Sequence, residues 1–184
     1  DNNTKVTDMA TVFSICRSLT TIPQGLFDKC TEVTSFRETF NNCNVLPNIP
    51  TGLFDKCTKV TTFEGTFYNC DNLQSVPEGL FDSCTKVTNF SNMFYDCNNL
   101  QTIPGGLFDK CTKVTRFGYT FYGCRNLTGE SPYSIINVDG QDVKVHLYER
   151  NLYPDHFTAP TSYRSCFYNC TKLDDYSSIP SNWY

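Results

Sequence analysis

The stretch at residues 87–113, VTNFSNMFYDCNNLQTIPGGLFDKCTK, determines the fold because near copies of it begin at residues 33, 60 and 114. The copies follow one another at a fixed interval of 27 residues, and the register starts near Val6. Fixed periods of about 20 to 50 residues are typical of solenoids, propellers and other repeat arrays. A propeller blade needs about 40 residues, so the shorter period predicts a solenoid with one coil per copy.

Aligned copies place the same apolar residue types in the same positions. The Phe column is Phe13, Phe40, Phe67, Phe94 and Phe121, and the Cys column is Cys16, Cys43, Cys70, Cys97 and Cys124. A sixth, degenerate copy lies at residues 160–180 and keeps Phe167, Cys170 and Leu173 in the columns. One unit alone buries too little apolar surface to fold, so we expect stacked coils to share a core.

Spacing within the unit gives its expected secondary structure. The apolar residues of FSNMFYDC at residues 90–97 recur at intervals of three and four, which predicts a turn or two of helix. NLQTIP at residues 99–104 ends at a proline and is predicted to be a short strand that pairs in parallel with its copies. The rival architecture, a stack of helical hairpins, is disfavoured by the recurring Pro, Gly and β-branched residues.

The unit resembles the repeat of the BspA-like leucine-rich family, V-T-x-M-x-x-M-F-x-x-C-x-x-L-x-x-L. VTDMATVFSIC at residues 6–16 matches that form best, and the resemblance covers residues 4–128 and 160–180. It implies an α/β fold, a right-handed leucine-rich-repeat-like solenoid, on an exported or cell-surface bacterial protein with a role in adhesion or ligand binding. The chain departs from the family form in one of the Met positions, which is Phe in most copies, and in the added block GLFDKC.

We expect three regions along the chain. Residues 1–128 would form five coils of 27 residues, residues 129–159 a β-hairpin insertion, and residues 160–184 the degenerate terminal repeat with a C-terminal cap. Asp139-Gly140 between two β-rich runs is a strong signal for a two-residue hairpin turn. The insertion is expected to cap the end of the solenoid. Alternatively, its aromatic and imidazole side chains form a small site: Tyr133, His146, Tyr148 and Tyr153.

Composition excludes several classes of partner. The formal net charge is -4, and Lys and Arg occur singly along the chain, so nucleic acid is not an expected partner. No apolar run is long enough to span a bilayer, and DNNTKVTDM at residues 1–9 does not resemble a secretion signal. We expect an extracellular or cell-surface protein whose signal or lipid anchor is absent from this chain, which is plausibly one piece of a longer protein.

Eleven cysteines occur in the chain, and ten of them fall into two repeated columns. Column mates would stand about 4.8 Å apart with parallel side chains, which suits buried free thiols better than disulfides. No C-x-x-C pair is present and only two histidines occur, so no metal site is expected. Asp28, Asp55, Asp82 and Asp109 form a further column, for which local capping is a simpler role than calcium binding.

Outward columns are where a solenoid carries function. Next to the Phe column lies a tyrosine stripe, which consists of Tyr68, Tyr95, Tyr122 and Tyr168. It is the candidate ligand-binding surface, because Tyr is favoured at protein interfaces and its ring can also stack on sugars. The alternative is that these rings only cover the seams between coils.

No nucleophile elbow, phosphate loop or zinc motif appears, so neither catalysis nor a cofactor is expected. The leading prediction is a binding or adhesion module for a protein or host ligand at the cell surface. The alternatives are a structural spacer that carries another domain and a glycan-binding accessory protein.

Overall fold

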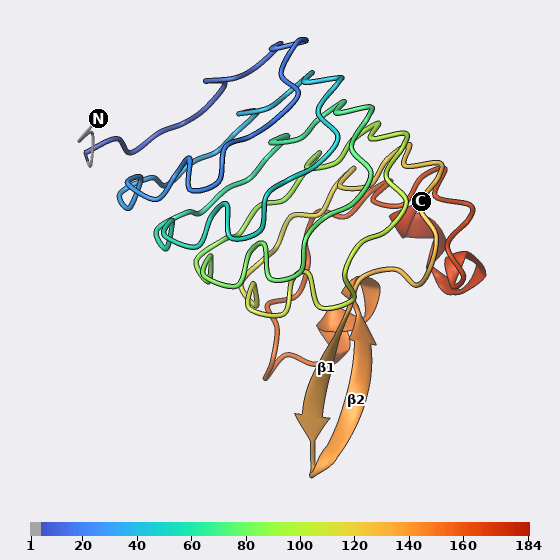
Figure 1. The fold of residues 1–184 in the computed structure, drawn as a ribbon. Coiled ribbons are helices and arrows are strands. Elements are labelled where there is room, and N and C mark those ends of the chain that lie inside the picture. The colour runs from blue at the N-terminus through green and yellow to red at the C-terminus, as the bar shows by residue number, and fades with distance from the viewer. Residues whose placement is uncertain (1–4) are drawn as a thin grey trace.

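In the computed structural model, which describes residues 5–184, the chain winds into coils that stack along one axis (Figure 1). Isolated parallel bridges join equivalent residues of successive coils. They link Asp8 to Ser35, Ser35 to Thr62, Thr62 to Asn89 and Asn89 to Arg116. The predicted leucine-rich-repeat-type solenoid is therefore confirmed.

The helix predicted at residues 90–97 is not formed, and no α-helix occurs among residues 5–184. Every second amide of this segment donates to the next coil, as Phe90 N does to Arg116 O at 2.9 Å and Phe94 N to Thr120 O at 2.8 Å. The intervening amides donate back three residues. The segment is thus a run of tight turns. Side chains three or four residues apart in these turns point to the same side, as they would in a helix.

Positive backbone φ angles recur in these turns. Asn42, Asn69 and Asp96 have φ values of 59°, 54° and 51°, and the equivalent Gly123 has 75°. Asn, Asp and Gly tolerate the left-handed region best, which explains their presence directly before Cys43, Cys70, Cys97 and Cys124; in the first coil Ile15 has a φ of 62° before Cys16. A helix would require negative φ throughout, so these residues select turns.

The strand predicted at residues 99–104 is reduced to one parallel bridge, between Thr102 and Ser75. The more extensive parallel pairing passes instead through the column of Asn89, ahead of the turns. Proline at the end of the predicted strand removes an amide donor there, which limits the ladder.

Three ladders of stacked phenylalanines fill the core. Neighbouring rings along a ladder lie 5.4 to 6.3 Å apart between centroids and are nearly parallel. The ladders are Phe13, Phe40, Phe67, Phe94, Phe121 and Phe167; Phe36, Phe63, Phe90 and Phe117; and Phe27, Phe54, Phe81 and Phe108. Each coil therefore supplies its neighbours with most of their apolar contacts.

All eleven cysteines are free, and all except Cys16 are buried. Each column thiol donates to a phenylalanine carbonyl of the preceding coil. Cys70 Sγ lies 3.2 Å from Phe40 O, and Cys97 Sγ lies 3.1 Å from Phe67 O. Burial raises the pKa of the Cys57 thiol to about 12 and that of Cys43 to about 11.

The degenerate copy stacks on the fifth coil in register. Arg116 bridges Ser162, and Phe121 N donates to Cys166 O at 2.9 Å. Two short 3-10 helices then close this end of the stack: η2, Tyr176–Ser178, and η3, Ser181–Trp183. Trp183 O accepts from Phe167 N at 2.9 Å, as a further coil would.

The insertion contains the only paired strands of the described chain. β1, Tyr133–Val138, pairs antiparallel with β2, Gln141–His146, across the Asp139-Gly140 turn. This hairpin projects from the side of the stack (Figure 1). The capping expected of the insertion comes from the residues after the hairpin, because the hairpin itself leaves the stack.

Those residues begin with the 3-10 helix η1, Leu147–Leu152. They cover the end of the ladder that runs from Phe27 to Phe108. Arg150 is fully buried, and its guanidinium donates to Phe108 O at 3.0 Å and Cys111 O at 3.1 Å. In the preceding coil, Cys111 Sγ donates to the equivalent Phe81 and Cys84 carbonyls. Arg150 therefore takes the place of the thiol that the missing coil would supply.

Candidate functional site

The tyrosine stripe forms one continuous stack of rings across four coils. Centroids of neighbouring rings are 4.6 Å apart for Tyr68 and Tyr95, 4.5 Å for Tyr95 and Tyr122, and 4.8 Å for Tyr122 and Tyr168. Interplanar angles are at most 15°. The first three side chains are half-buried and Tyr168 is 41% exposed.

Stacking decides which parts of the rings a ligand can reach. The faces of Tyr95 and Tyr122 are covered by their neighbours, so only ring edges and hydroxyls remain for contact. Burial, reinforced by the nearby Asp96 carboxylate, raises the pKa of Tyr95 to about 12. The Tyr95 hydroxyl therefore resists ionisation, and the stacked rings of the stripe form a rigid row of donors and acceptors.

Tyr119 is a further tyrosine whose ring packs beside the stripe. Its ring lies 5.9 Å from Tyr122 and 6.4 Å from Tyr95 between centroids, tilted by about 50° to both. Its backbone φ is 59°, an unfavourable value for a bulky aromatic residue. A positive φ recurs at the equivalent position of the other coils, at Thr11, Glu38, Gly65, Asn92 and Ser165, so the conformation belongs to the repeat.

Beside Tyr119 lies a hollow of about 480 Å³. It is lined by Glu64, Asn89, Ser91, Asn92, Arg116, Gly118, Tyr119, Thr161 and Ser162. Two small residues leave this space. They are Ser91 and Gly118, which lie at equivalent positions of two successive coils. A Cβ on Gly118 would lie 3.1 Å from Ser162 Oγ, so the close approach of the last coil favours glycine there.

The two charged side chains that line the hollow, Glu64 and Arg116, differ in whether they have partners. Glu64 accepts from Asn89 Nδ2 at 2.9 Å and lies 3.9 Å from Arg37 Nε. Arg116 is exposed and forms no ion pair with any described residue, and the same holds for Arg164 on the next coil. Arg116 is therefore the charged residue of the lining that has no ion pair within the described part of the chain.

The predicted site in the insertion is partly assembled. The ring of His146 stacks on Tyr148 at 5.1 Å between centroids and meets Tyr133 edge-on at 5.7 Å. Tyr153 makes none of the ring contacts found in residues 5–184. Three of the four predicted residues thus gather at the base of the hairpin.

A buried polar cluster anchors this base to the last coil. Ser131 Oγ donates to Asp175 Oδ2 at 2.5 Å and lies 2.9 Å from His146 Nδ1. The Tyr148 hydroxyl also donates to Asp175, at 3.4 Å. Ser131 is fully buried and its hydroxyl contacts both partners, so the trio is a structural anchor rather than a nucleophile with its base.

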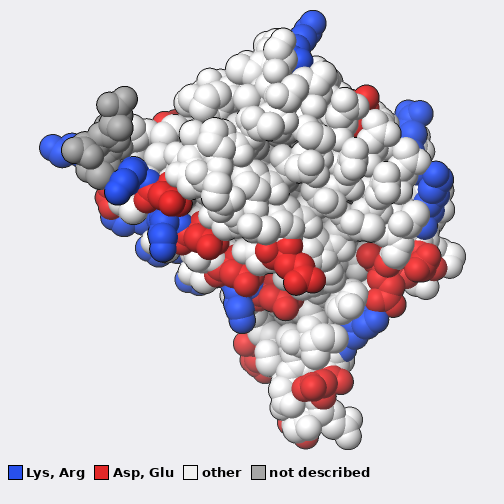
Figure 2. Space-filling model, viewed as in Figure 1, with Lys and Arg blue, Asp and Glu red and all other residues white. Residues whose placement is uncertain are grey.

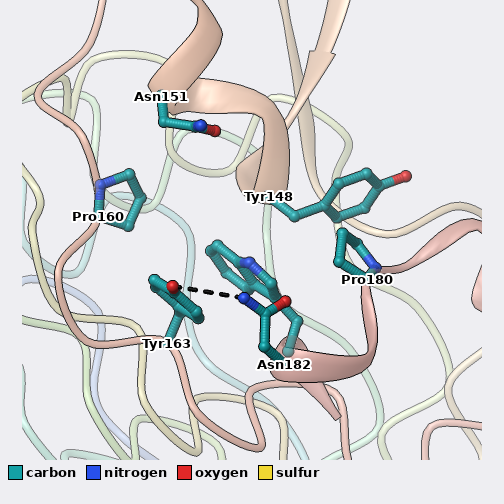
Figure 3. Close-up of a pocket in the computed structure, with 7 residues that line it drawn as sticks. Tyr148, Asn151, Pro160, Tyr163, Pro180 and Asn182 are labelled. Carbon is teal, nitrogen blue, oxygen red and sulfur yellow. Dashed lines mark hydrogen bonds between the residues drawn. The ribbon is translucent and has the colours of Figure 1, made fainter.

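A second pocket, of about 280 Å³, lies at the C-terminal cap (Figure 3). Its lining is Tyr148, Asn151, Pro160, Tyr163, Pro180, Asn182 and Trp183. Tyr163 stacks on Trp183 at 4.7 Å, and Asn182 Nδ2 donates to the Tyr163 hydroxyl at 3.4 Å. Trp183 is only 4% exposed, so its ring is a wall of the cap and offers no free face.

Acidic side chains gather along one edge of the stack, with basic side chains beside them (Figure 2). The aspartates of the GLFD blocks bend back over their own glycines, since a Cβ on Gly52 would lie 2.9 Å from Asp55 Oδ2. Lysines that the sequence scatters singly become aligned by the coil register, and Lys59 pairs with Glu32 of the preceding coil at 2.6 Å. Within residues 5–184, no His, Cys, Asp and Glu side chains form a group that could hold a metal ion.

The register of the coils and the ladders define a leucine-rich repeat solenoid. A family model described as the BspA type leucine rich repeat region matches residues 7–131 in six copies. The chain therefore belongs to the BspA-type leucine-rich repeat family. The resemblance drawn from the sequence is confirmed.

Two solved structures are similar to the chain. A leucine rich cell surface protein of Faecalibacterium prausnitzii is 24% identical with a TM-score of 0.44, and the match covers 77% of this chain. A leucine-rich repeat protein of T. pallidum is 24% identical with a TM-score of 0.28, over 67% of this chain and 61% of its own. The chain spans 41% of the length of the F. prausnitzii protein. No curated protein sequence matches, and none of the described helices is long and apolar enough to cross a membrane.

Proposed function

We propose that this chain is a non-enzymatic protein-binding module of a bacterial cell surface, and that the tyrosine stripe is its binding face. The observation that carries the proposal is the continuous stack of four rings, with centroids 4.5 to 4.8 Å apart, along the outside of the solenoid. Leucine-rich repeat modules bind proteins in general, and family membership makes an adhesive role at the surface the natural setting.

Pre-organisation favours this face for protein contacts. Ordering a flexible side chain on binding costs roughly 0.5 to 1.5 kcal/mol, and stacked rings have already lost that freedom on folding. Tyrosine and arginine are enriched among the residues that dominate binding energy. Arg116 lines the hollow beside Tyr119 and forms no ion pair within residues 5–184. The face therefore combines rigid aromatic edges with an available cation.

The same geometry disfavours a sugar platform. Carbohydrate stacking needs an open ring face, and the inner rings of the stripe cover one another. Ring stacking leaves only the two terminal faces of the row uncovered, one on Tyr68 and one on Tyr168. We therefore rank a protein ligand above the glycan-binding alternative.

The test is a binding array of host proteins and glycans. It uses the native chain and a variant in which Tyr68, Tyr95, Tyr122 and Tyr168 are all replaced by Ser. A second variant replaces the same four with Phe, which keeps the stack and removes the hydroxyls. A control variant, Tyr153→Ser and Tyr184→Ser, alters tyrosines outside the stripe. Thermal melting of each variant establishes that it is folded.

A protein ligand that binds the native chain and the control, but not the Ser variant, supports the proposal. Retained binding by the Phe variant would assign the contact to ring edges. The absence of any ligand for the well-folded native chain would favour the structural spacer, and binding confined to glycans would favour the accessory protein.

A further inference from the structure

We infer that the hollow beside Tyr119 receives an acidic segment of a protein partner, with Arg116 as the group that binds its carboxylate. The inference rests on the proposed function, because it names the chemistry of the partner for the same face. It depends on three features of the hollow: its shape, its unequal charge and the aromatic ring on its wall.

The shape suits an extended peptide segment. The hollow measures about 480 Å³ and runs across the column where the side chains are smallest, Ser91 and Gly118. It borders Tyr119, whose ring continues into the stripe through Tyr122 at 5.9 Å. A segment seated in the hollow would therefore contact aromatic edges along one side.

Its available charge is positive. Glu64, the acid of the lining, is occupied by Asn89 Nδ2 at 2.9 Å and by Arg37 Nε at 3.9 Å. Arg116 forms no ion pair within residues 5–184, and Arg164 on the adjacent coil forms none either. A guanidinium binds a carboxylate through two parallel hydrogen bonds, so the hollow selects Asp or Glu over Lys or Arg.

Hydroxyl and amide donors add to this preference. Ser162 and Ser91 hydroxyls, the Asn92 amide and the Tyr119 hydroxyl line the same space as Arg116. Each can donate to a carboxylate oxygen. The face as a whole still lies on a chain of net charge -4, so attraction of an acidic segment is confined to this end of the stripe.

Tyr119 lies at a position of the repeat where the backbone φ is positive in other coils as well, with values of 53° at Glu38, 58° at Asn92 and 52° at Ser165. The conformation therefore belongs to the repeat, and the distinctive feature of Tyr119 is its ring, which borders the hollow. Asn adopts a positive φ more readily than Tyr. Replacing Tyr119 with Asn should therefore leave the fold at least as stable and weaken binding.

Fluorescence anisotropy with defined peptides tests the inference. The probe is a labelled peptide of alternating Thr and Glu, and the matched peptides carry Gln or Lys in place of Glu. An oligogalacturonate is the anionic glycan probe. The proteins are the native chain, R116Q, Y119N and the control R17Q, which alters an exposed arginine of the first coil.

We expect saturable binding of the Glu peptide alone, weakened about tenfold by R116Q and unchanged by R17Q. Y119N should weaken binding while its melting temperature stays equal to the native value or rises. Added salt should weaken binding of the Glu peptide, because the contact is electrostatic.

Three results with these probes would overturn the inference. They are no saturable binding of the Glu peptide, equal binding by R116Q, and tighter binding of the oligogalacturonate with the same dependence on Arg116. A protein ligand from the array that needs the stripe tyrosines but not Arg116 would overturn this inference and leave the proposed function in place.

Discussion

Alkaline solution should unfold this protein unusually early, because the fold depends on buried neutral thiols. Burial raises the thiol pKa of seven cysteines that are 0% exposed and lie in the third coil or beyond. They are Cys70, Cys84, Cys97, Cys111, Cys124, Cys166 and Cys170. The cause in each is the cost of placing a thiolate in the apolar core.

The sign of the effect follows from the direction of the shift. The folded pKa lies above the unfolded value of 9.0, so the unfolded chain releases protons first as the pH rises. The stabilisation is complete below about pH 8 and is lost progressively as the pH rises through about 9. Well above about pH 9, ionisation of each thiol in the unfolded chain lowers the free energy of unfolding by about 1.4 kcal/mol per pH unit. The seven thiols together lower it by about 3 kcal/mol at about pH 9 and by about 10 kcal/mol at about pH 10.

A domain of ordinary stability, about 5 to 15 kcal/mol, should therefore unfold between roughly pH 9.5 and 10.5. Circular dichroism against pH at constant ionic strength, with a reductant present, gives the midpoint. Urea titrations between about pH 8 and 9.5 give the slope of the unfolding free energy.

The matched variant is C97A with C124A. The variant should be less stable than the native chain at neutral pH. Above about pH 9 the contribution of these seven thiols to the fall in its unfolding free energy should be smaller by about two sevenths. The reasoning is refuted if the native chain stays folded at about pH 11, or if the slope is the same in the variant.

Three further substitutions test the packing. Arg150→Met should destabilise the chain by about 2 kcal/mol in urea titrations, because two carbonyls at the end of the stack lose their donors. The control Arg164→Met, on the surface, should have little effect. Equal effects of the two substitutions would contradict the capping role of Arg150. Phe94→Ala, in the middle of a ladder, should cost about 3 to 5 kcal/mol, and a loss below about 1 kcal/mol would show that the ladder is not a packed core. Asp175→Asn should weaken the anchor of the hairpin by about 1 to 2 kcal/mol, seen as faster limited proteolysis there, and unchanged cleavage would contradict it.

The sequence predicted the features that depend on its period. The constant interval placed Phe94 and Cys97 in inward columns, and both are fully buried. The Asp139-Gly140 pair lies at the turn between β1 and β2, with φ values of 52° and 85°. These features are local or strictly repeated, so they can be read without coordinates.

The helix at residues 90–97 was wrong because spacing alone does not distinguish a helix from a run of tight turns. Asn92 and Asp96, at φ values of 58° and 51°, carried the signal that separates the two. Residues that tolerate the left-handed region at every fourth position indicate turns.

Features that arise between coils were not predictable from one unit. Ser91 and Gly118 leave a hollow only because their coils are adjacent, and Tyr119 closes its side. Arg150 replaces a missing thiol only once the end of the ladder is known. The sequence also gave no indication that Tyr163 and Trp183 would stack across the C-terminal cap.

Side-chain footprinting of a complex tests the central claim most directly. The native chain, alone and saturated with the host protein that binds it most strongly on the array, is exposed to hydroxyl radicals and analysed by mass spectrometry. The account predicts several-fold slower oxidation of Tyr119, Tyr122 and Tyr168 in the complex, with Tyr153 and Tyr184 unchanged. Unchanged oxidation of the stripe, or protection confined to the projecting hairpin, would contradict it.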